Sequence, residues 1–145
     1  LGRAVDVSNP EDTVALWEYA AGELGRLDIW VNNAGVAHTT KPIVETTADS
    51  VRTMVNTNML GTIFGSQAAV RGMSAQGGGK LFNVLRGGSD GSIRPGMGVY
   101  GATKRGLDSF TRALVKEVKG RDRGGSAKPG RSRRPCPSAS PRRCR

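Results

Sequence analysis

Tyr100 and Lys104 are the residues whose types and spacing most directly indicate chemistry, since they stand four positions apart. On a helix this spacing places both side chains on one face. A free tyrosine has a pKa of roughly 10, and a neighbouring ammonium group lowers that value because it favours the phenolate. Such a pair can work as a general acid or base at neutral pH. Solvated helix faces show the same spacing, so the pair needs support from its surroundings.

Two further motifs supply that support. The segment Asn32–Gly35, with the sequence Asn-Asn-Ala-Gly, directly follows the apolar run Leu27–Val31. Such a run indicates a buried strand, and open α/β folds bind ligands at the carboxyl ends of their strands. Asn58 lies three residues before Gly61 in a helical stretch, where asparagine is otherwise unfavourable. Taken singly, the two motifs indicate a turn and an exposed helix residue, and only their order along the chain predicts a shared site.

Strand and helix signals alternate along the first part of the chain. Ser8 and Pro10 mark a helix start, with Glu11 three residues after Ser8 as in a capping box. Apolar residues then recur at helical spacing in three segments that short apolar runs separate. We expect strands at Arg3–Val7, Leu27–Val31 and Lys80–Leu85. We expect a first helix that starts within Ser8–Glu11 and ends near Gly25, and further helices at Val51–Met73 and at about Val99–Lys119. This alternation predicts an α/β fold with a parallel sheet and helices on both of its faces.

The composition changes abruptly at residue 120. Residues 1–119 carry 13 basic and 11 acidic residues, whereas residues 120–145 carry nine basic residues and one acidic residue, Asp122. The formal charge of +10 therefore belongs mainly to the last segment. That segment is rich in Arg, Gly, Pro and Ser and has almost no apolar side chains, so we expect a disordered basic tail. Its composition is also what translation in a wrong frame or through an intron would produce.

Several other kinds of protein and site are not indicated. No run of 18 or more apolar residues is present, so we expect no transmembrane segment. Cys136 and Cys144 do not have the spacing of a metal site, and we expect no metal ion. The first residues do not have the pattern of a signal or transit peptide. Because there is no initiator Met, we expect the chain to begin inside a longer one.

In this order and at these separations, the motifs resemble those of the short-chain dehydrogenase/reductase family over residues 1–119. The resemblance implies a partial Rossmann-type fold, a doubly wound parallel sheet in three α/β/α layers. It also implies reduction of a carbonyl with NAD(P)H. Asp6 would lie beside the adenine ring of the cofactor, and the backbone of Asn33, Ala34 and Gly35 would line it.

The resemblance assigns catalytic roles as well. Tyr100 would protonate the carbonyl oxygen as hydride arrives, and Lys104 would hold the hydroxyl groups of the nicotinamide ribose. Asn58 would anchor a water molecule in a proton relay that leads to Lys104. Gly87 stands where the family usually has a serine, thirteen residues before the tyrosine, so we assign Ser89 to polarising the substrate carbonyl. The alternative for Ser89 is a plain loop residue.

A narrower resemblance is to the chlorophyll(ide) b reductases of plants and green algae. It rests on the segments Asp28–Gly35, Asn56–Gly61, Phe82–Val84, Gly87–Gly91, Arg94–Pro95 and Tyr100–Arg105. It implies reduction of the 7-formyl group of chlorophyll(ide) b by NADPH, in the chloroplast, during chlorophyll breakdown. NADH stays open as the reductant because the segment that would read the ribose 2′ position is not in the sequence. Arg86 departs from the pattern, since a small or acidic residue is usual there.

Three alternatives stay open. A generic carbonyl or 3-oxoacyl reductase of the same family shares the motifs and would be cytoplasmic. A truncated, inactive chain could serve as a binding partner of a full-length paralogue. A nucleic-acid-binding protein acting through residues 120–145 would need interleaved aromatic residues, which that segment lacks, so we expect no nucleic-acid partner.

Two expectations concern the chain as a whole. The glycine-rich turn that holds the cofactor pyrophosphate in this family is not in the sequence, so we expect the chain alone to be inactive. We also expect the long helices to form a homo-oligomer or a complex with a paralogue. The protein would then act as part of a larger assembly on a small-molecule carbonyl substrate.

Overall fold

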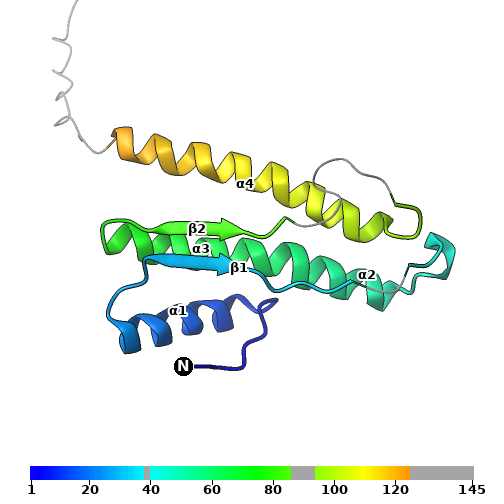
Figure 1. Ribbon diagram of the computed structural model, residues 1–145, viewed down its shortest axis with the longest axis horizontal. Coiled ribbons are helices and arrows are strands. Elements are labelled where there is room, and N and C mark those ends of the chain that lie inside the picture. Colours follow the sequence, from blue (N-terminus) through cyan, green and yellow to red (C-terminus); the bar gives the residue numbers. More distant parts are fainter. Residues whose placement is uncertain (38–39, 86–93, 125–145) are drawn as a thin grey trace, which may run out of the picture.

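A computed structural model describes residues 1–37, 40–85 and 94–124, the last five without their side chains. Figure 1 shows two strands in the middle with helix α3 behind them, α1 along one side and α4 along the other. The elements are α1 (Pro10–Leu24), β1 (Ile29–Asn32), the 3₁₀-helix η1 (Ile43–Glu45), α2 (Ala48–Met54), the π-helix η2 (Val55–Leu60), α3 (Gly61–Ala75), β2 (Lys80–Asn83) and α4 (Gly98–Gly124).

β1 and β2 form a parallel two-stranded sheet. Ile29 is the partner of Lys80, and Asn32 is the partner of Asn83, so the polar residues that end the two strands lie opposite each other. The ladder continues past the strand ends, because the N–H of Val84 donates to the carbonyl of Asn32 at 3.0 Å. Both carboxyl ends therefore meet at one edge of the sheet, as the predicted α/β fold requires.

Glycines in α3 allow neighbouring segments to approach its backbone closely. A Cβ atom at Gly61 would lie 2.7 Å from Cγ2 of Val7, and one at Gly65 would overlap Oδ1 of Asn32. A larger residue at Gly61 would push away the segment before α1 that holds Val7, and one at Gly65 would push the end of β1 away from the helix. α2, η2 and α3 follow one another without a break, so the helix predicted over Val51–Met73 is confirmed as one helical stretch with a π-helical turn inside it.

The amino end of α1 differs in detail from the predicted capping box. Asn9 is the N-cap, and its Oδ1 accepts a hydrogen bond from the N–H of Glu11 at 2.9 Å. Ser8 instead donates its N–H and its hydroxyl to the carboxylate of Asp6, at 2.9 and 2.7 Å. The prediction that Ser8 caps the helix was wrong, because the side-chain oxygen of an asparagine accepts hydrogen bonds from the free N–H groups of a helix end equally well.

Residues Arg3–Val7, predicted as a strand, do not form one. The described part of the chain offers them no neighbouring strand, since β1 and β2 pair only with each other. Backbone N–H and C=O groups need such a partner to form a ladder. An apolar run was therefore not sufficient evidence for a strand at this position.

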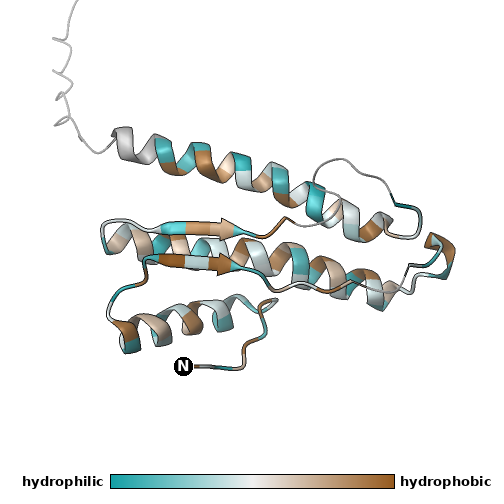
Figure 2. Cartoon of the chain, in the orientation of Figure 1, coloured by the Kyte–Doolittle hydropathy of each residue, from teal (hydrophilic) through white to brown (hydrophobic). Residues whose placement is uncertain are grey.

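Among the described residues, helix α3 covers one face of the sheet. On the two strands, Ile29, Val31 and Phe82 remain 59%, 53% and 51% exposed. Figure 2 shows hydrophobic residues in both strands, with α3 behind them. The fold is the partial Rossmann type that the sequence predicted, with one of its two expected helical layers in the described residues.

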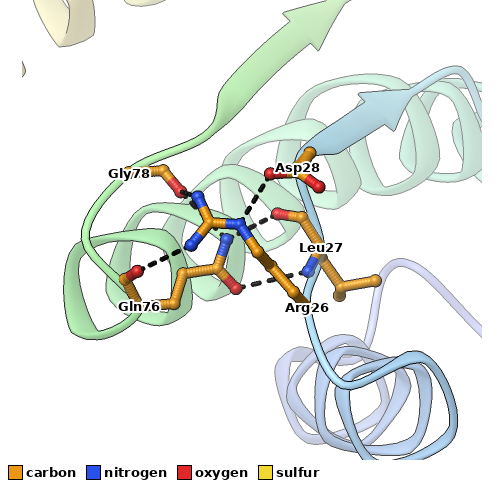
Figure 3. Close-up of polar contacts among 5 residues, drawn as sticks. All are labelled: Arg26, Leu27, Asp28, Gln76 and Gly78. Atoms are coloured by element: carbon orange, nitrogen blue, oxygen red, sulfur yellow. Dashed lines mark hydrogen bonds and ion pairs between the residues drawn. The ribbon is translucent and has the colours of Figure 1, made fainter.

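A polar cluster at the amino end of the sheet ties the end of α3 to the start of β1 (Figure 3). The Gln76 amide donates to the carbonyl of Leu27 at 2.7 Å and accepts from its N–H at 3.3 Å. The Arg26 guanidinium donates to the carbonyls of Gln76 and Gly78 at 2.9 and 3.4 Å, and pairs with Asp28 at 2.7 Å. The Gln76 side chain thus adds a pair of hydrogen bonds with Leu27 beside those that join the backbones of the two strands.

α4 continues to Gly124 and so takes in the first residues of the segment predicted as a tail. Arginine is a good helix former, and the next proline is Pro129, so the backbone can continue past residue 119. Residues 125–145 lie outside the described residues. In the part of the chain that is described, no helix is both long and apolar enough to span a membrane.

Candidate active site

A π-helical turn in the middle of the long helical stretch places Asn58 in the interior, where it is 0% exposed. Such turns are rare in helices and are frequent at functional sites. Oδ1 of Asn58 accepts a hydrogen bond from the N–H of Val36 at 2.7 Å, and Nδ2 donates to the carbonyl of Val36 at 2.9 Å. The amide therefore fixes the backbone that directly follows the segment Asn32–Gly35.

Thr103 connects this amide to α4. Nδ2 of Asn58 donates to Oγ1 of Thr103 at 3.4 Å, and the Thr103 hydroxyl donates to the carbonyl of Tyr100 at 2.7 Å. Thr103 is 3% exposed, so the connection is shielded from water. The sequence reasoning gave Thr103 no role, although its place between the tyrosine and the lysine was a signal that could have found it.

Lys104 is buried at the carboxyl end of β2, with only 5% of its surface exposed. Its Nζ donates to the carbonyl of Val84 at 3.2 Å. Burial lowers the pKa of Lys104 below its ordinary value of 10.5, because removal from water disfavours the ammonium form. The same Nζ lies 5.7 Å from the ring centroid of Tyr100, which is half-buried. One face of α4 therefore holds the phenol and the amine next to each other.

Gly35 brings the third motif to the same place. A Cβ atom there would lie 3.4 Å from Oδ1 of Asn58 and 3.7 Å from Nζ of Lys104. Asn33 and Ala34, just before it, are exposed. The motifs singled out in the sequence therefore converge at the carboxyl end of the sheet, with an open stretch of backbone beside them.

Two predicted site residues are not placed in this cluster. Asp6 lies in the loop before α1, and its carboxyl group is exposed. Hydrogen bonds from Ser8 lower the pKa of this group, the one from the hydroxyl more than the one from the N–H. Ser89 falls within residues 86–93, which lie outside the described part of the chain, as do Arg86 and Gly87. The proposed hydroxyl beside Tyr100 thus stays a prediction.

A second polar cluster, not foreseen from sequence, joins the two strand ends to α3 and α4. Nδ2 of Asn32 donates to Oδ1 of Asn83 at 2.9 Å and to Oγ of Ser66 at 3.1 Å. Nδ2 of Asn83 donates to Oγ1 of Thr111 at 3.0 Å. Both asparagines end an apolar strand, and that shared feature was the signal that could have paired them.

The chemical groups at this end of the sheet suit hydrogen bonding and proton transfer. A protonated lysine has three N–H donors, and the carbonyl of Val84 takes one from Lys104. The remaining donors can hold hydroxyl groups of a ligand, next to the phenol of Tyr100. The described residues contain no group of three or more His, Cys, Asp or Glu side chains that could hold a metal ion.

Sequence relatives agree with the resemblance. The pattern of the short chain dehydrogenase family matches residues 1–122. A probable chloroplastic chlorophyll(ide) b reductase of Arabidopsis thaliana is 42% identical over 118 residues, which are 81% of this chain and 24% of that protein. A chloroplastic chlorophyll(ide) b reductase of Oryza sativa subsp. japonica is 38% identical, covering 81% and 35%. A diacetyl reductase of Staphylococcus epidermidis is 38% identical, covering 78% and 44%. The chain thus spans less than half of each relative.

Solved structures share the fold. ElxO with NADP bound has a TM-score of 0.73 at 30% identity, covering 79% of this chain and 46% of that one. The 3-ketoacyl-(acyl-carrier-protein) reductase of Brucella melitensis, complexed with NADH, has a TM-score of 0.75 at 29% identity, covering 82% and 50%. Both confirm the Rossmann-type fold predicted from the sequence. Motifs, fold and relatives agree that this chain belongs to the short chain dehydrogenase family of NAD(P)-dependent oxidoreductases.

Proposed function

We propose that this chain supplies the proton-transferring side of an NADPH-dependent reductase that acts on the 7-formyl group of chlorophyll(ide) b. The observation that carries the proposal is the convergence of Gly35, Asn58 and Lys104 beside Tyr100 at the carboxyl end of the sheet. The substrate and a chloroplast location are supported by the two plant relatives that bear this name.

The exposed backbone before Gly35 fits a nicotinamide cofactor. With no side chain at Gly35, a flat ligand can lie against the backbone and reach the buried amine of Lys104. The free N–H donors of Lys104 would hold ribose hydroxyl groups, and the carboxylate of Asp6 would lie toward the adenine. Bound NADPH would supply the hydride, with NADH as the alternative to be tested.

The residues of this chain would carry the proton. The hydroxyl of Tyr100 would protonate the carbonyl oxygen of the formyl group, which Ser89 would polarise. Oδ1 of Asn58 and Nζ of Lys104 both lie close to the position of a Gly35 side chain, so a water molecule beside Gly35 would bridge them. That water would pass a proton from solvent toward Tyr100 by way of Lys104.

Two other outcomes are open to the same test. The diacetyl reductase relative favours a generic reductase of small carbonyls. The second outcome is a catalytically inactive chain that binds a paralogue. Self-association through α3 and α4 is compatible with both an active and an inactive protein. These readings differ in substrate and turnover and share the fold.

A hybrid protein tests the substrate. Residues 1–119 replace the matching segment of the Arabidopsis relative, and the hybrid is incubated with NADPH and either chlorophyllide b or diacetyl. We expect the 7-hydroxymethyl pigment to form and diacetyl to remain. Reduction of diacetyl without a pigment product would assign the site to small carbonyls. A folded hybrid that reduces neither would support the inactive binding partner.

A further inference from the structure

We infer that Asn83 is a positioning residue for Lys104, acting through the end of β2 and through Thr111 of α4. This inference rests on the proposed function for its catalytic meaning and on the geometry alone for its structural content. The hydrogen bond that the structure shows for the amine of Lys104 is to the carbonyl of Val84 and not to Asn83. Asn83 holds the two segments between which that amine lies.

The side chain of Asn83 fixes the peptide that receives Lys104. Its Oδ1 accepts hydrogen bonds from Nδ2 of Asn32 at 2.9 Å and from Oγ of Ser66 at 3.3 Å. The next residue, Val84, is held through its N–H by the carbonyl of Asn32 at 3.0 Å. The carbonyl of Val84 thus points from a strand end restrained by three hydrogen bonds, and it accepts the bond from Lys104.

The same side chain also attaches α4 to the sheet. Nδ2 of Asn83 donates to Oγ1 of Thr111, seven residues after Lys104. At 1.5 Å per residue, the two attachments are about 10 Å apart along α4. Two points fix both the height and the rotation of a helix over a strand, whereas one point leaves it free to pivot.

Apolar packing cannot take over this task, because α4 stands away from β2 beside Thr111. A groove of about 650 Å³ opens there, lined by Thr111 and Asn83 and by apolar residues of α4 and β2 such as Leu114, Val118 and Leu81. Dispersion contacts are missing where no atoms meet across the groove. The hydrogen bond between Asn83 and Thr111 therefore sets the position of α4 at this point.

The test measures how well Lys104 is held, in the 145-residue chain itself and without substrate or cofactor. Acetylation of Lys104 by acetic anhydride is followed by mass spectrometry, with the exposed Lys80 and Lys116 as internal references. Thr111→Val removes only the hydroxyl, and Thr111→Ser restores it. Asn83→Leu removes the side-chain hydrogen bonds of Asn83 to Asn32, Ser66 and Thr111.

We expect Thr111→Val to raise the relative acetylation rate of Lys104 about fivefold to tenfold, the effect of one lost hydrogen bond on a local opening. Asn83→Leu removes that bond and the bonds to Asn32 and Ser66, so it should raise the rate at least as much. Thr111→Ser should return the rate to within about twofold of the original. The matched control is Gln76→Leu, which removes the amide at the opposite end of the sheet. It should leave the relative rate of Lys104 unchanged.

Two results would overturn the inference. One is an unchanged Lys104 rate in Thr111→Val, which decides the matter even where Asn83→Leu fails to fold. The other is an equal rise in Gln76→Leu, since that would indicate general loosening. In the hybrid protein, Thr111→Val should lower kcat and leave KM unchanged. A hybrid without any activity would contradict the proposed function and leave the acetylation result standing.

Discussion

Each end of the sheet is tied to the long helical stretch by a side-chain amide, but the two ends differ in burial and in unused hydrogen-bonding groups. At the amino end, Gln76 pairs with Leu27 beside an exposed ion pair, Arg26 and Asp28, whose side chains are 51% and 70% exposed. At the carboxyl end, Asn58 is fully buried near the amine of Lys104, which donates one hydrogen bond among the described residues, to the carbonyl of Val84. An amide that joins a helix to a strand is thus no sign of function by itself, and the buried amine of Lys104 is the feature that distinguishes the carboxyl end.

The largest expected effect is on turnover at the carboxyl end. In the hybrid protein, Lys104→Met should lower kcat by about 10³-fold, because the phenol loses its neighbouring cation and the relay loses a member. The rate of pigment reduction under saturating NADPH measures this. Lys80→Met, at the other end of the sheet, is the control and should change kcat little. A Lys104→Met hybrid with more than a tenth of the original kcat would contradict the assignment of Lys104.

Asn58→Ala should have the largest effect on stability. It removes two part-buried hydrogen bonds, to the N–H and to the carbonyl of Val36, so the free energy of unfolding should fall by about 2–3 kcal/mol. Urea unfolding of the chain measures the change. Asn56→Ala, an exposed asparagine in the same π-helical turn, is the matched control and should change stability by less than about 0.5 kcal/mol. Equal losses in the two variants would show that the turn itself, and not the amide, is what matters.

A smaller loss is expected at the amino end. Gln76→Leu removes two hydrogen bonds to Leu27 in a partly buried place, which should lower the free energy of unfolding by about 1–2 kcal/mol. The kcat of the hybrid should stay within about twofold of its original value, since no group at this end belongs to the proposed chemistry. A tenfold fall in kcat would break the contrast between the two ends.

The smallest effect concerns pH. The unfolded chain binds a proton on Lys104 up to about pH 10.5, whereas the folded chain releases it at lower pH. Between these two values the unfolded state holds more protons, so the free energy of unfolding of the chain should rise with pH relative to Lys104→Met. Urea unfolding at pH 7 and pH 10 gives the difference. A fall in that difference toward high pH would contradict a lowered pKa for Lys104.

Features encoded within a few neighbouring residues could be predicted from the sequence. Apolar runs located β1 and β2, and helical periodicity located α1, because each signal lies inside the element it describes. The meeting of Gly35, Asn58 and Lys104 followed from topology, since parallel strands end at one edge of a sheet. The family could be predicted because several motifs occur in a fixed order along the chain, and the match to the family pattern confirmed it.

Features that depend on partners far away in the chain could not be predicted. The π-helical turn is held by contacts between Asn58 and Val36, which lie 22 residues apart. The bond between Asn83 and Thr111 spans 28 residues. The strand predicted at Arg3–Val7 failed for the same reason, since a strand exists only where another pairs with it.

We propose that Tyr100, at the carboxyl end of the sheet, donates the proton when the carbonyl is reduced by NADPH. The most direct test compares two tyrosine variants of the hybrid protein, Tyr100→Phe and Tyr19→Phe, in the rate of 7-hydroxymethyl pigment formation from chlorophyllide b and NADPH. Both changes remove one hydroxyl and nothing else. We predict that Tyr100→Phe lowers kcat by about 10²- to 10⁴-fold while Tyr19→Phe leaves it unchanged. A Tyr100→Phe hybrid that forms the pigment at the original rate would contradict the account.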